Sequence, residues 1–336
     1  MSTVPAAPAV DLDTLADLCA PWCLRVVVTL GVADALAGGA GRVDDLAAAA
    51  GCDAGALAEV LGHLVGLGVT ECAPGGAFAL TPAGRGLLEP GRRLFLDLSG
   101  IGGRMAGAWA TLPAYVRTGQ PAYADAFGLP FWQDLETHPA LRASFDALMG
   151  GVGHGPADPE LLADGWAGVR HLVDVGGGTG DMLCAVLRSH KGMRGTLVDL
   201  PQTAGEAARA IDAAGLSDRA QVVGQSFFDP LPAGGDAYLL RKVLNDWPDA
   251  EAVAILRRCA EAAGAGGRVL VAGGVSPDGA LATLTPERVL VGGRDRPLAV
   301  FVRLAGEAGL AVVRSGHGGG GRFVVECRPV VRERGT

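Results

Sequence analysis

The stretch that decides the fold is His171-Leu172-Val173-Asp174-Val175-Gly176-Gly177-Gly178-Thr179-Gly180-Asp181. An apolar, β-branched run ends at three successive glycines, and residues 181–187 then follow a helical pattern. The stretch predicts a buried strand, a tight turn and the start of a helix. Because glycine has no Cβ and can adopt positive φ, such a turn lets the backbone approach a nucleotide-like ligand closely.

The spacing of the glycines distinguishes several nucleotide-binding patterns. The dinucleotide fingerprint has a third glycine where this chain has Asp181, and the turn has no phosphate-binding lysine like that of a P-loop. With Asp174 at the strand tip, the turn resembles motif I of class I S-adenosylmethionine (SAM) methyltransferases. Asp199 ends the next predicted strand, where a carboxylate can accept both ribose hydroxyls of an adenosine. The alternatives to SAM at this turn are another nucleotide, or a structural turn that binds no ligand.

The composition is that of a globular protein with many tight turns. The chain has 336 residues, of which 49% are hydrophobic and 53 are glycine, and this length predicts two domains. A net charge of -8 argues against nucleic acid or an anionic membrane as a partner. No stretch has the pattern of a signal peptide or reaches transmembrane length, so we expect a cytoplasmic protein without a membrane partner.

The spacing of cysteine and histidine residues predicts no metal site. The seven cysteines include no CxxC pair, and the six histidines are equally scattered. Cys19 and Cys23 lie four residues apart on a predicted helix and can share a face. We interpret the cysteines as small buried hydrophobic side chains in a reducing compartment.

Residues 11–100 show the pattern of a winged helix, preceded by a Pro/Ala-rich tail over 1–10 that we expect to be disordered. Two helices, over 43–51 and 54–66, precede a hairpin around Pro74-Gly75-Gly76. The second helix carries no Lys or Arg, so it lacks the phosphate contacts that dominate DNA affinity. We therefore predict a domain for homodimerisation rather than for DNA binding.

Residues 101–165 are predicted to form a helical linker, with helices over Met105 to Thr118 and Phe131 to Met149. Large flat or flexible side chains gather there, and they suit either a core or the walls of a pocket for a planar ligand. The candidates for substrate binding are Met105, Trp109, Phe131, Trp132, Phe145 and Met149. The stretch 150–155 is too rich in glycine for a stable helix, and its His154 is either a catalytic candidate or a solvated side chain.

From 166 to 330, predicted strands alternate with helices, which is the signature of a doubly wound, Rossmann-like α/β fold. The last two strands are close enough for a hairpin, so the final strand is predicted to be antiparallel. The predicted strands are 171–175, 195–199, 220–224, 236–240, 267–272, 311–315 and 322–327. Ligands of such sheets bind at the carboxyl ends of the strands, where the candidates are Asp174, Asp199, Ser226, Phe227 and Arg241.

Three further motifs carry a family resemblance: Ser226 to Pro232 (SFFDPLP), Val243 to Asp249 (VLNDWPD) and Gly292 to Arg296 (GGRDR). With the glycine turn, they resemble plant-type and bacterial small-molecule O-methyltransferases. The similarity extends to the actinobacterial branch that tailors aromatic polyketides, which includes a hydroxylase beside the methyltransferases. The resemblance implies an N-terminal winged-helix dimerisation domain, a helical middle and a class I Rossmann-like SAM domain.

The resemblance also implies roles for single residues. Gly176, Gly178 and Gly180 would line the methionine and ribose of SAM, and Asp199 would bind the ribose hydroxyls. Ser226 and Phe227 would flank the adenine. Trp132, Phe145 and Met149 would line a pocket for an aromatic acceptor. The remaining cofactor candidates at this edge are Asp174, Leu200 and Arg241.

The chain departs from the family at the catalytic position. In plant-type members the segment is His-Asp-Trp and the histidine removes the phenol proton, whereas this chain has Asn245, which is no base at neutral pH. Val300 replaces an acid of a later helix, and Gly273-Gly274 replaces an acid-basic pair. Methyl transfer depends strongly on alignment, which contributes about 7 to 11 kcal/mol. We therefore predict that Asn245 orients the acceptor, with Asp246 as a second catalytic candidate.

The sequence thus predicts a SAM-dependent O-methyltransferase that acts on a hydroxyl group of a polycyclic natural product and releases S-adenosylhomocysteine. An alternative is a methyltransferase-fold enzyme that binds SAM without transferring its methyl and catalyses hydroxylation, decarboxylation or cyclisation. The changes at Asn245 and Val300 and in the loop over 273–286 favour that alternative. A transcriptional regulator is a third possibility, and the absence of cations from the second winged-helix helix argues against it.

Overall fold

A computed structural model describes residues 11–39, 41–149, 157–162, 165–280 and 284–330. The chain forms two compact units, Met1–Ala106 and Gly107–Thr336. The tail expected at 1–10 and the candidate His154 lie outside the described residues. Most of the helical segment expected between 101 and 165 belongs to the second unit.

The N-terminal unit packs short helices against a small antiparallel sheet with the strand order β1-β3-β2. Helix α5 begins where the Asp53 side chain accepts a hydrogen bond from the Ala56 N–H, which caps the helix. Leu61 and Leu64 of this helix are fully buried in the core of the unit. The elements are α1 (Leu12–Ala16), α2 (Cys19–Thr29), α3 (Val32–Ala37), β1 (Gly41–Arg42), α4 (Val43–Ala50), α5 (Ala54–Gly66), β2 (Thr70–Cys72), β3 (Ala77–Leu80), η1 (Gly84–Leu88), α6 (Pro90–Leu96) and α7 (Ile101–Ala108), which crosses the unit boundary.

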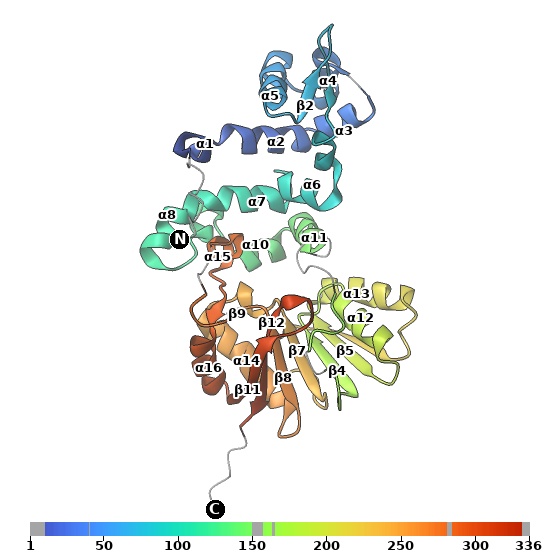
Figure 1. Ribbon diagram of the computed structural model, residues 1–336, viewed down its shortest axis with the longest axis vertical. Helices are drawn as coiled ribbons and strands as arrows, with labels where there is room; N and C mark the ends of the chain where they lie inside the picture. The colour runs from blue at the N-terminus through green and yellow to red at the C-terminus, as the bar shows by residue number, and fades with distance from the viewer. Residues whose placement is uncertain (1–10, 40, 150–156, 163–164, 281–283, 331–336) are drawn as a thin grey trace, which may run out of the picture. The chain divides into compact units, whose positions relative to one another are not determined.

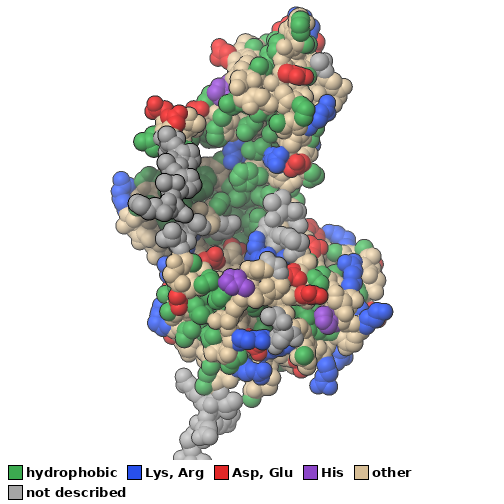
Figure 2. Space-filling model, in the orientation of Figure 1, with side chains coloured by type: hydrophobic (Ala, Val, Ile, Leu, Met, Phe, Trp, Pro, Cys, Tyr) green, Lys and Arg blue, Asp and Glu red, His purple; other side chains and the backbone are tan. Residues whose placement is uncertain are grey.

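The winged-helix pattern of two helices and a hairpin is therefore confirmed. On the face seen in Figure 2, acidic and basic side chains are interspersed and basic ones do not merge into a continuous patch over the N-terminal unit. In the described part of the chain, no single helix has the length and apolar character needed to cross a membrane. Among the described helices, one pair meets that requirement when its two members are taken together: α4 and α5, across a bend of 114°.

Short helices open the second unit, and prolines set their boundaries. The helix predicted over Phe131 to Met149 is divided at His138, because Pro139 cannot donate the backbone hydrogen bond of a helix interior and starts a new helix instead. The helix predicted over Met105 to Thr118 is likewise interrupted, by the 3-10 turn η2 ahead of Pro113. The elements are η2 (Trp109–Thr111), α8 (Leu112–Thr118), α9 (Tyr123–Phe127), α10 (Phe131–Thr137) and α11 (Pro139–Leu148).

A seven-stranded sheet with the order β11-β12-β8-β7-β4-β5-β6 forms the body of this unit. Strands β4 to β8 are parallel to one another, and the final strand, β12, is antiparallel to both of its neighbours, β8 and β11, as the sequence predicted. The strand order reverses beside β4, where doubly wound folds bind their ligands. The strands are β4 (His171–Val175), β5 (Arg194–Asp199), β6 (Ala220–Gly224), β7 (Ala237–Arg241), β8 (Arg268–Ala272), β11 (Leu310–His317) and β12 (Phe323–Pro329), and the two-stranded pair is β9 (Val275–Ser276) with β10 (Arg296–Pro297).

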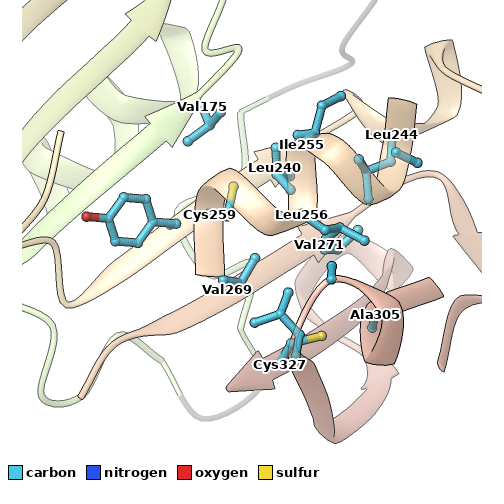
Figure 3. Close-up of a cluster of buried hydrophobic side chains, with 14 of the residues drawn as sticks. Val175, Leu240, Leu244, Ile255, Leu256, Cys259, Val269, Val271, Ala305 and Cys327 are labelled. Atoms are coloured by element: carbon cyan, nitrogen blue, oxygen red, sulfur yellow. The ribbon is translucent and has the colours of Figure 1, made fainter. Parts of the chain in front are cut away.

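Helices cover both faces of this sheet (Figure 1). On β4, Val173 faces the hydrophobic cluster under α14 and α16, whereas Leu172 faces the cluster under α12 and α13. Figure 3 shows the first cluster, in which Ile255 of α14 packs with Val271 of β8. The remaining elements are α12 (Asp181–Ser189), α13 (Pro201–Ala213), η4 (Leu244–Asp246), α14 (Asp249–Ala263), α15 (Pro286–Val291), α16 (Leu298–Glu307) and η5 (Gly319–Gly321).

Asp174 places a carboxyl group in the interior of this sheet. Its side chain is 1% exposed, and its Oδ2 atom has no hydrogen-bond partner among the described residues. Burial raises the pKa of Asp174 to about 7, opposed by the attraction of Arg241 and reinforced by Asp199. The protonated form is therefore much more populated in the folded state than in an unfolded chain.

We predict that Asp174 makes folding less favourable as the pH rises from about 4 to about 7. The pKa is about 7 in the folded state and about 3.9 when unfolded, so the folded state holds more protons in this window and loses that stabilisation as the pH increases. In urea titrations, the free energy of unfolding of Asp174→Asn should rise relative to that of the wild type by on the order of 2 to 3 kcal/mol between about pH 5 and about pH 8. The exposed Asp218→Asn should show no such gain, and parallel pH responses of wild type and Asp174→Asn would contradict the prediction.

Candidate active site

The glycine turn after β4 has no room for side chains on its inner side. Gly176, Gly178 and Gly180 have φ of 70°, 59° and 86°, which is the left-handed region. A Cβ on Gly176 would lie 2.7 Å from Cγ2 of Val243, and one on Gly177 would lie 2.8 Å from the Leu197 side chain. The turn therefore rests directly on the segments that follow β7 and form β5, and glycine is needed at these two positions.

Asp199, at the end of β5, is fixed by two backbone donors. The Gly178 N–H donates to Oδ2 at 2.9 Å, and the Leu200 N–H donates to Oδ1 at 2.8 Å. Burial raises the pKa of this carboxyl, while these two N–H groups and the positive charge of Arg142 oppose the rise. A fixed carboxylate beside a glycine turn has the donor and acceptor chemistry that an adenosine ribose requires.

A cavity of about 220 Å³ opens at this edge of the sheet. It collects most of the predicted cofactor residues and three of the predicted substrate residues: Gly176, Gly178, Asp199, Leu200, Ser226, Phe227, Trp132, Phe145 and Met149, together with the catalytic candidate Asp246. Sequence reasoning did not select nine further lining residues: Glu136, Arg142, Asp146, Thr179, Thr203, Phe228, Lys242, Val243 and Trp247.

Aromatic rings form one wall of the cavity. Trp132 of α10 stacks on Trp247, with ring centroids 5.4 Å apart and an angle of 15° between the planes. Phe227 meets Trp247 edge to face at 5.8 Å, and Phe145 meets Trp132 in the same way at 5.7 Å. Such a wall offers flat apolar surfaces and ring edges to a planar ligand. The sequence signal for Trp247 was its place in the VLNDWPD motif.

A buried polar network lies beside the aromatic wall. The Arg142 guanidinium donates through Nε to both oxygens of Asp146 at 3.0 Å and through Nη2 to Thr203 Oγ1 at 3.0 Å. Arg142 and Asp146 are one turn apart on α11, and Thr203 belongs to α13. The network thus ties the helix that carries Phe145 to the helix that follows Asp199. The i, i+4 spacing of Arg142 and Asp146 was its only sequence signal.

The predicted catalytic pair lies on the 3-10 turn η4. The Asn245 amide donates through Nδ2 to Asp246 Oδ1 at 2.7 Å, and the Asn245 Oδ1 atom is buried without a partner among the described residues. Asp246 lines the cavity, whereas Asn245 does not. The expectation that Asn245 itself reaches the ligand is therefore not supported by the cavity, because its amide points to its neighbour.

Arg296 stabilises the η4 turn through its guanidinium group. Its guanidinium is 1% exposed, pairs with Asp249 at 2.8 Å, and donates to the carbonyls of Leu244 and Trp247 at 2.9 and 2.6 Å. These bonds fix the residues on both sides of Asp246. The second arginine of the GGRDR motif thus supports the turn that carries the predicted catalytic pair.

Glycines complete the support of η4. A Cβ on Gly274 would lie 2.8 Å from the Asn245 nitrogen, and one on Gly293 would lie 2.0 Å from the Asn245 carbonyl oxygen. Val300, on α16, packs against the hydrophobic cluster under that helix rather than lining the cavity. The packing around these positions therefore accounts for a glycine at 274 and a valine at 300.

Several candidates lie outside the cavity lining. Asp174, Gly180 and Arg241 are not among the lining residues, and Asp174 and Arg241 are buried. Phe131 is buried and packs edge to face on Trp132 at 5.0 Å, so it supports the wall from behind. Trp109 is 39% exposed on η2, and Met105 is buried in the N-terminal unit. These two positions do not support the predicted substrate contacts.

Comparison with known proteins agrees with this geometry. An O-methyltransferase domain profile matches residues 109–311, and an O-methyltransferase dimerisation domain profile matches residues 12–90. The 2,7-dihydroxy-5-methyl-1-naphthoate 7-O-methyltransferase of Streptomyces carzinostaticus is 45% identical over 93% of this chain and 95% of its own length. The aclacinomycin 10-hydroxylase of Streptomyces purpurascens is 41% identical over 90% of this chain and 84% of its own length.

Among solved structures, a similar fold is that of an O-methyltransferase from neocarzinostatin biosynthesis, in complex with SAM and 2-hydroxy-5-methyl naphthoic acid. The TM-score is 0.83 at 41% identity, over 96% of this chain and 100% of the other. The predictions of a Rossmann-like fold, of SAM as the cofactor and of an N-terminal dimerisation domain are confirmed. The chain belongs to the SAM-dependent O-methyltransferase family.

Proposed function

We propose that this protein methylates a phenolic hydroxyl group of a bicyclic or larger aromatic natural product, with SAM as donor and S-adenosylhomocysteine as product. One observation carries the proposal: a single cavity joins the Asp199 edge of the sheet to the wall formed by Trp132 and Trp247. The similarity to a naphthoate O-methyltransferase supports an acceptor of fused aromatic rings.

The residues at the sheet edge fit the cofactor. Gly176 and Gly178 line the cavity without side chains, so a ligand can reach their backbone, and the fixed Asp199 carboxylate can accept the ribose hydroxyls. Ser226 and Phe227 supply a hydroxyl and a ring for the adenine. When bound, SAM supplies an electrophilic methyl group on a positively charged sulfur.

The remaining wall suits the acceptor. Trp132, Phe145 and Met149 present flat and polarisable surfaces that can hold fused rings in one plane. Transfer of a methyl group requires the acceptor oxygen, the methyl carbon and the sulfur to be in line, so a rigid wall raises the rate by orientation. The Arg142 network keeps Phe145 in place by tying α11 to α13.

Asp246 is the side chain of the η4 turn that can accept a hydrogen bond from the acceptor hydroxyl. It lines the cavity, and the Asn245 amide fixes one of its oxygens at 2.7 Å. Asn245 stands where the family has its histidine base, and we assign it to positioning Asp246. An acceptor whose phenol is already acidic needs little more than this hydrogen bond.

A second function has a specific observation in its favour. The hydroxylase relative is 41% identical, and the position of the family base is occupied here by an amide that faces away from the cavity. An enzyme that keeps SAM intact while it adds oxygen or removes carbon dioxide would retain the cofactor edge unchanged. The mass of the product distinguishes the two functions.

Asp199→Ala should abolish SAM binding. The variant loses a charged acceptor of two hydrogen bonds, each worth about 1.5 to 3 kcal/mol, which corresponds to at least about a 100-fold loss of affinity. Isothermal titration calorimetry measures the SAM affinity of the variant directly. Asp212→Ala, an exposed aspartate at the far end of α13, is the matched control and should bind SAM as the wild type does. Unchanged affinity of Asp199→Ala would refute the ribose assignment.

Asp246→Asn should slow methyl transfer by about 100-fold or more with hydroxynaphthoates of ordinary phenol acidity. The loss should shrink as the acceptor phenol is made more acidic, because an ionised oxygen no longer needs an acceptor for its proton. Rates are measured from S-adenosylhomocysteine formation across a panel of substituted hydroxynaphthoates. A loss of the same size across the whole panel would show that Asp246 has only a structural role.

The N-terminal unit supports a homodimer. Leu12, Leu15 and Leu18 of the first helices are 73%, 71% and 67% exposed, and Trp22 is 45% exposed. A row of apolar side chains open to water is a surface that a second copy would cover. We predict that Leu15→Asp with Leu18→Asp shifts the protein from dimer to monomer in analytical ultracentrifugation. Val116→Asp, at an exposed position on α8, is the control and should remain a dimer. If the variant with both leucines changed also remains a dimer, the interface lies elsewhere.

A further inference from the structure

Two cysteines and a histidine meet in the N-terminal unit, and none of the three lines the active-site cavity. Cys19 and Cys23 are one turn apart on α2, and His63 is on the neighbouring helix α5. Their two sulfur atoms and an imidazole nitrogen all lie within 4.8 Å of one another. In the described part of the chain, this is the one group of three such side chains close enough to share a metal ion.

The histidine supplies a second, independent observation. Its Nε2 atom is buried and has no hydrogen-bond partner among the described residues. A buried polar nitrogen without a partner costs about 1 to 3 kcal/mol, so native structures rarely leave one unexplained. A metal ion bound through Nε2 would satisfy this atom.

The distance between the sulfur atoms fits a shared ion better than a disulfide. The two Sγ atoms are 3.9 Å apart. A tetrahedral site with Zn–S bonds of about 2.3 Å separates two sulfur ligands by about 3.8 Å, whereas a disulfide requires about 2.05 Å. The side chains therefore already have the separation that a zinc ion imposes.

The chemistry of the ligands selects the metal. Two thiols and one imidazole favour Zn²⁺ over hard ions such as Ca²⁺ or Mg²⁺, which prefer oxygen. Asp17, close enough to act electrostatically on Cys23, adds a negative charge that attracts a cation.

We propose that Cys19, Cys23 and His63 form a three-ligand Zn²⁺ site that clamps α2 to α5. Each side chain provides one bond, and the fourth position of the tetrahedron is left for water at the exposed Cys19 side. The bound ion joins the helix that carries the exposed Trp22 to the core of the unit, so it stabilises the N-terminal unit. It takes no part in methyl transfer.

The expectation from sequence was that no metal binds, because no spacing of cysteines signals a site. The third ligand is forty residues beyond Cys23 along the chain, and only the packing of α5 on α2 brings it near. The structure also modifies the interpretation of the cysteines as buried hydrophobic side chains. Cys23, Cys184, Cys259 and Cys327 are buried, but Cys19 and Cys72 are exposed.

The test is metal binding by the full-length, tag-free protein after reduction and removal of metals with a chelator. Titration with Co²⁺ should give the visible and near-ultraviolet absorption of a tetrahedral thiolate complex, saturating at one ion per chain, and Zn²⁺ should displace it. Cys19→Ser, at an exposed position that tolerates a small polar side chain, should lose this absorption and weaken Zn²⁺ binding at least about 100-fold. His63→Gln should also weaken it. Cys72→Ser, an exposed cysteine of the same unit, is the matched control and should bind as the wild type does.

A second measurement guards against misfolding of the variants. Zn²⁺ should raise the Tm of the wild type and of Cys72→Ser but leave that of Cys19→Ser unchanged, while circular dichroism shows that all three are folded. Absence of a stoichiometric cobalt complex in the reduced wild type would overturn the proposal. Equal binding by Cys19→Ser and Cys72→Ser, or a Cys19–Cys23 disulfide in the isolated protein that re-forms after reduction, would do so as well.

Discussion

The active site depends on the close approach of the turn after β4 to the strands beside it. No Cβ fits at Gly176 or Gly177, because Val243 and Leu197 already occupy that space. This contact brings the Gly178 N–H within 2.9 Å of Asp199, which fixes the carboxylate at the end of β5. The cofactor edge is therefore a consequence of backbone packing at the point where the strand order reverses.

The other half of the cavity is built from side chains that come from distant segments. Trp132 of α10 stacks on Trp247 after η4, and these two rings are more than a hundred residues apart in the sequence. Buried charges hold the two sides together: Arg142 connects α11 to α13, and Arg296 fixes the backbone of η4. Breaking such buried pairs on one side is costly, which gives the cavity a defined shape.

Lys242 marks the junction between the two halves. It is the one residue other than glycine with positive φ in the described part of the chain, at 55°, and it lines the cavity. Strained backbone of this kind tends to persist where the surrounding structure fixes it, often at functional sites. Gly273 leaves room for the Lys242 backbone, since a Cβ at position 273 would lie 3.3 Å from its Cα and N atoms.

Much of the sheet and of the cofactor edge could be predicted from sequence because their signals are local. The β-branched run of β4, its glycines and Asp199 lie within thirty residues of one another, and their periodicity and turn chemistry are sufficient. The acceptor wall and the Arg142 network could not be predicted in full, because they depend on which helices meet. Side-chain type alone gave Phe131 and Trp132 equal weight, and the family resemblance favoured Trp132, which lines the cavity. Prolines at the helix starts were visible in the sequence, but their effect in dividing α10 from α11 was not taken into account.

The central claim is that the cofactor edge and the aromatic wall serve one methyl transfer. Incubation of the protein with SAM labelled with deuterium in its methyl group and with a panel of hydroxynaphthoic acids tests it most directly. Mass spectrometry should show a product heavier by one labelled methyl group, on oxygen, with one S-adenosylhomocysteine formed for each product. A product that gains oxygen or loses carbon dioxide while labelled SAM remains intact would contradict the claim.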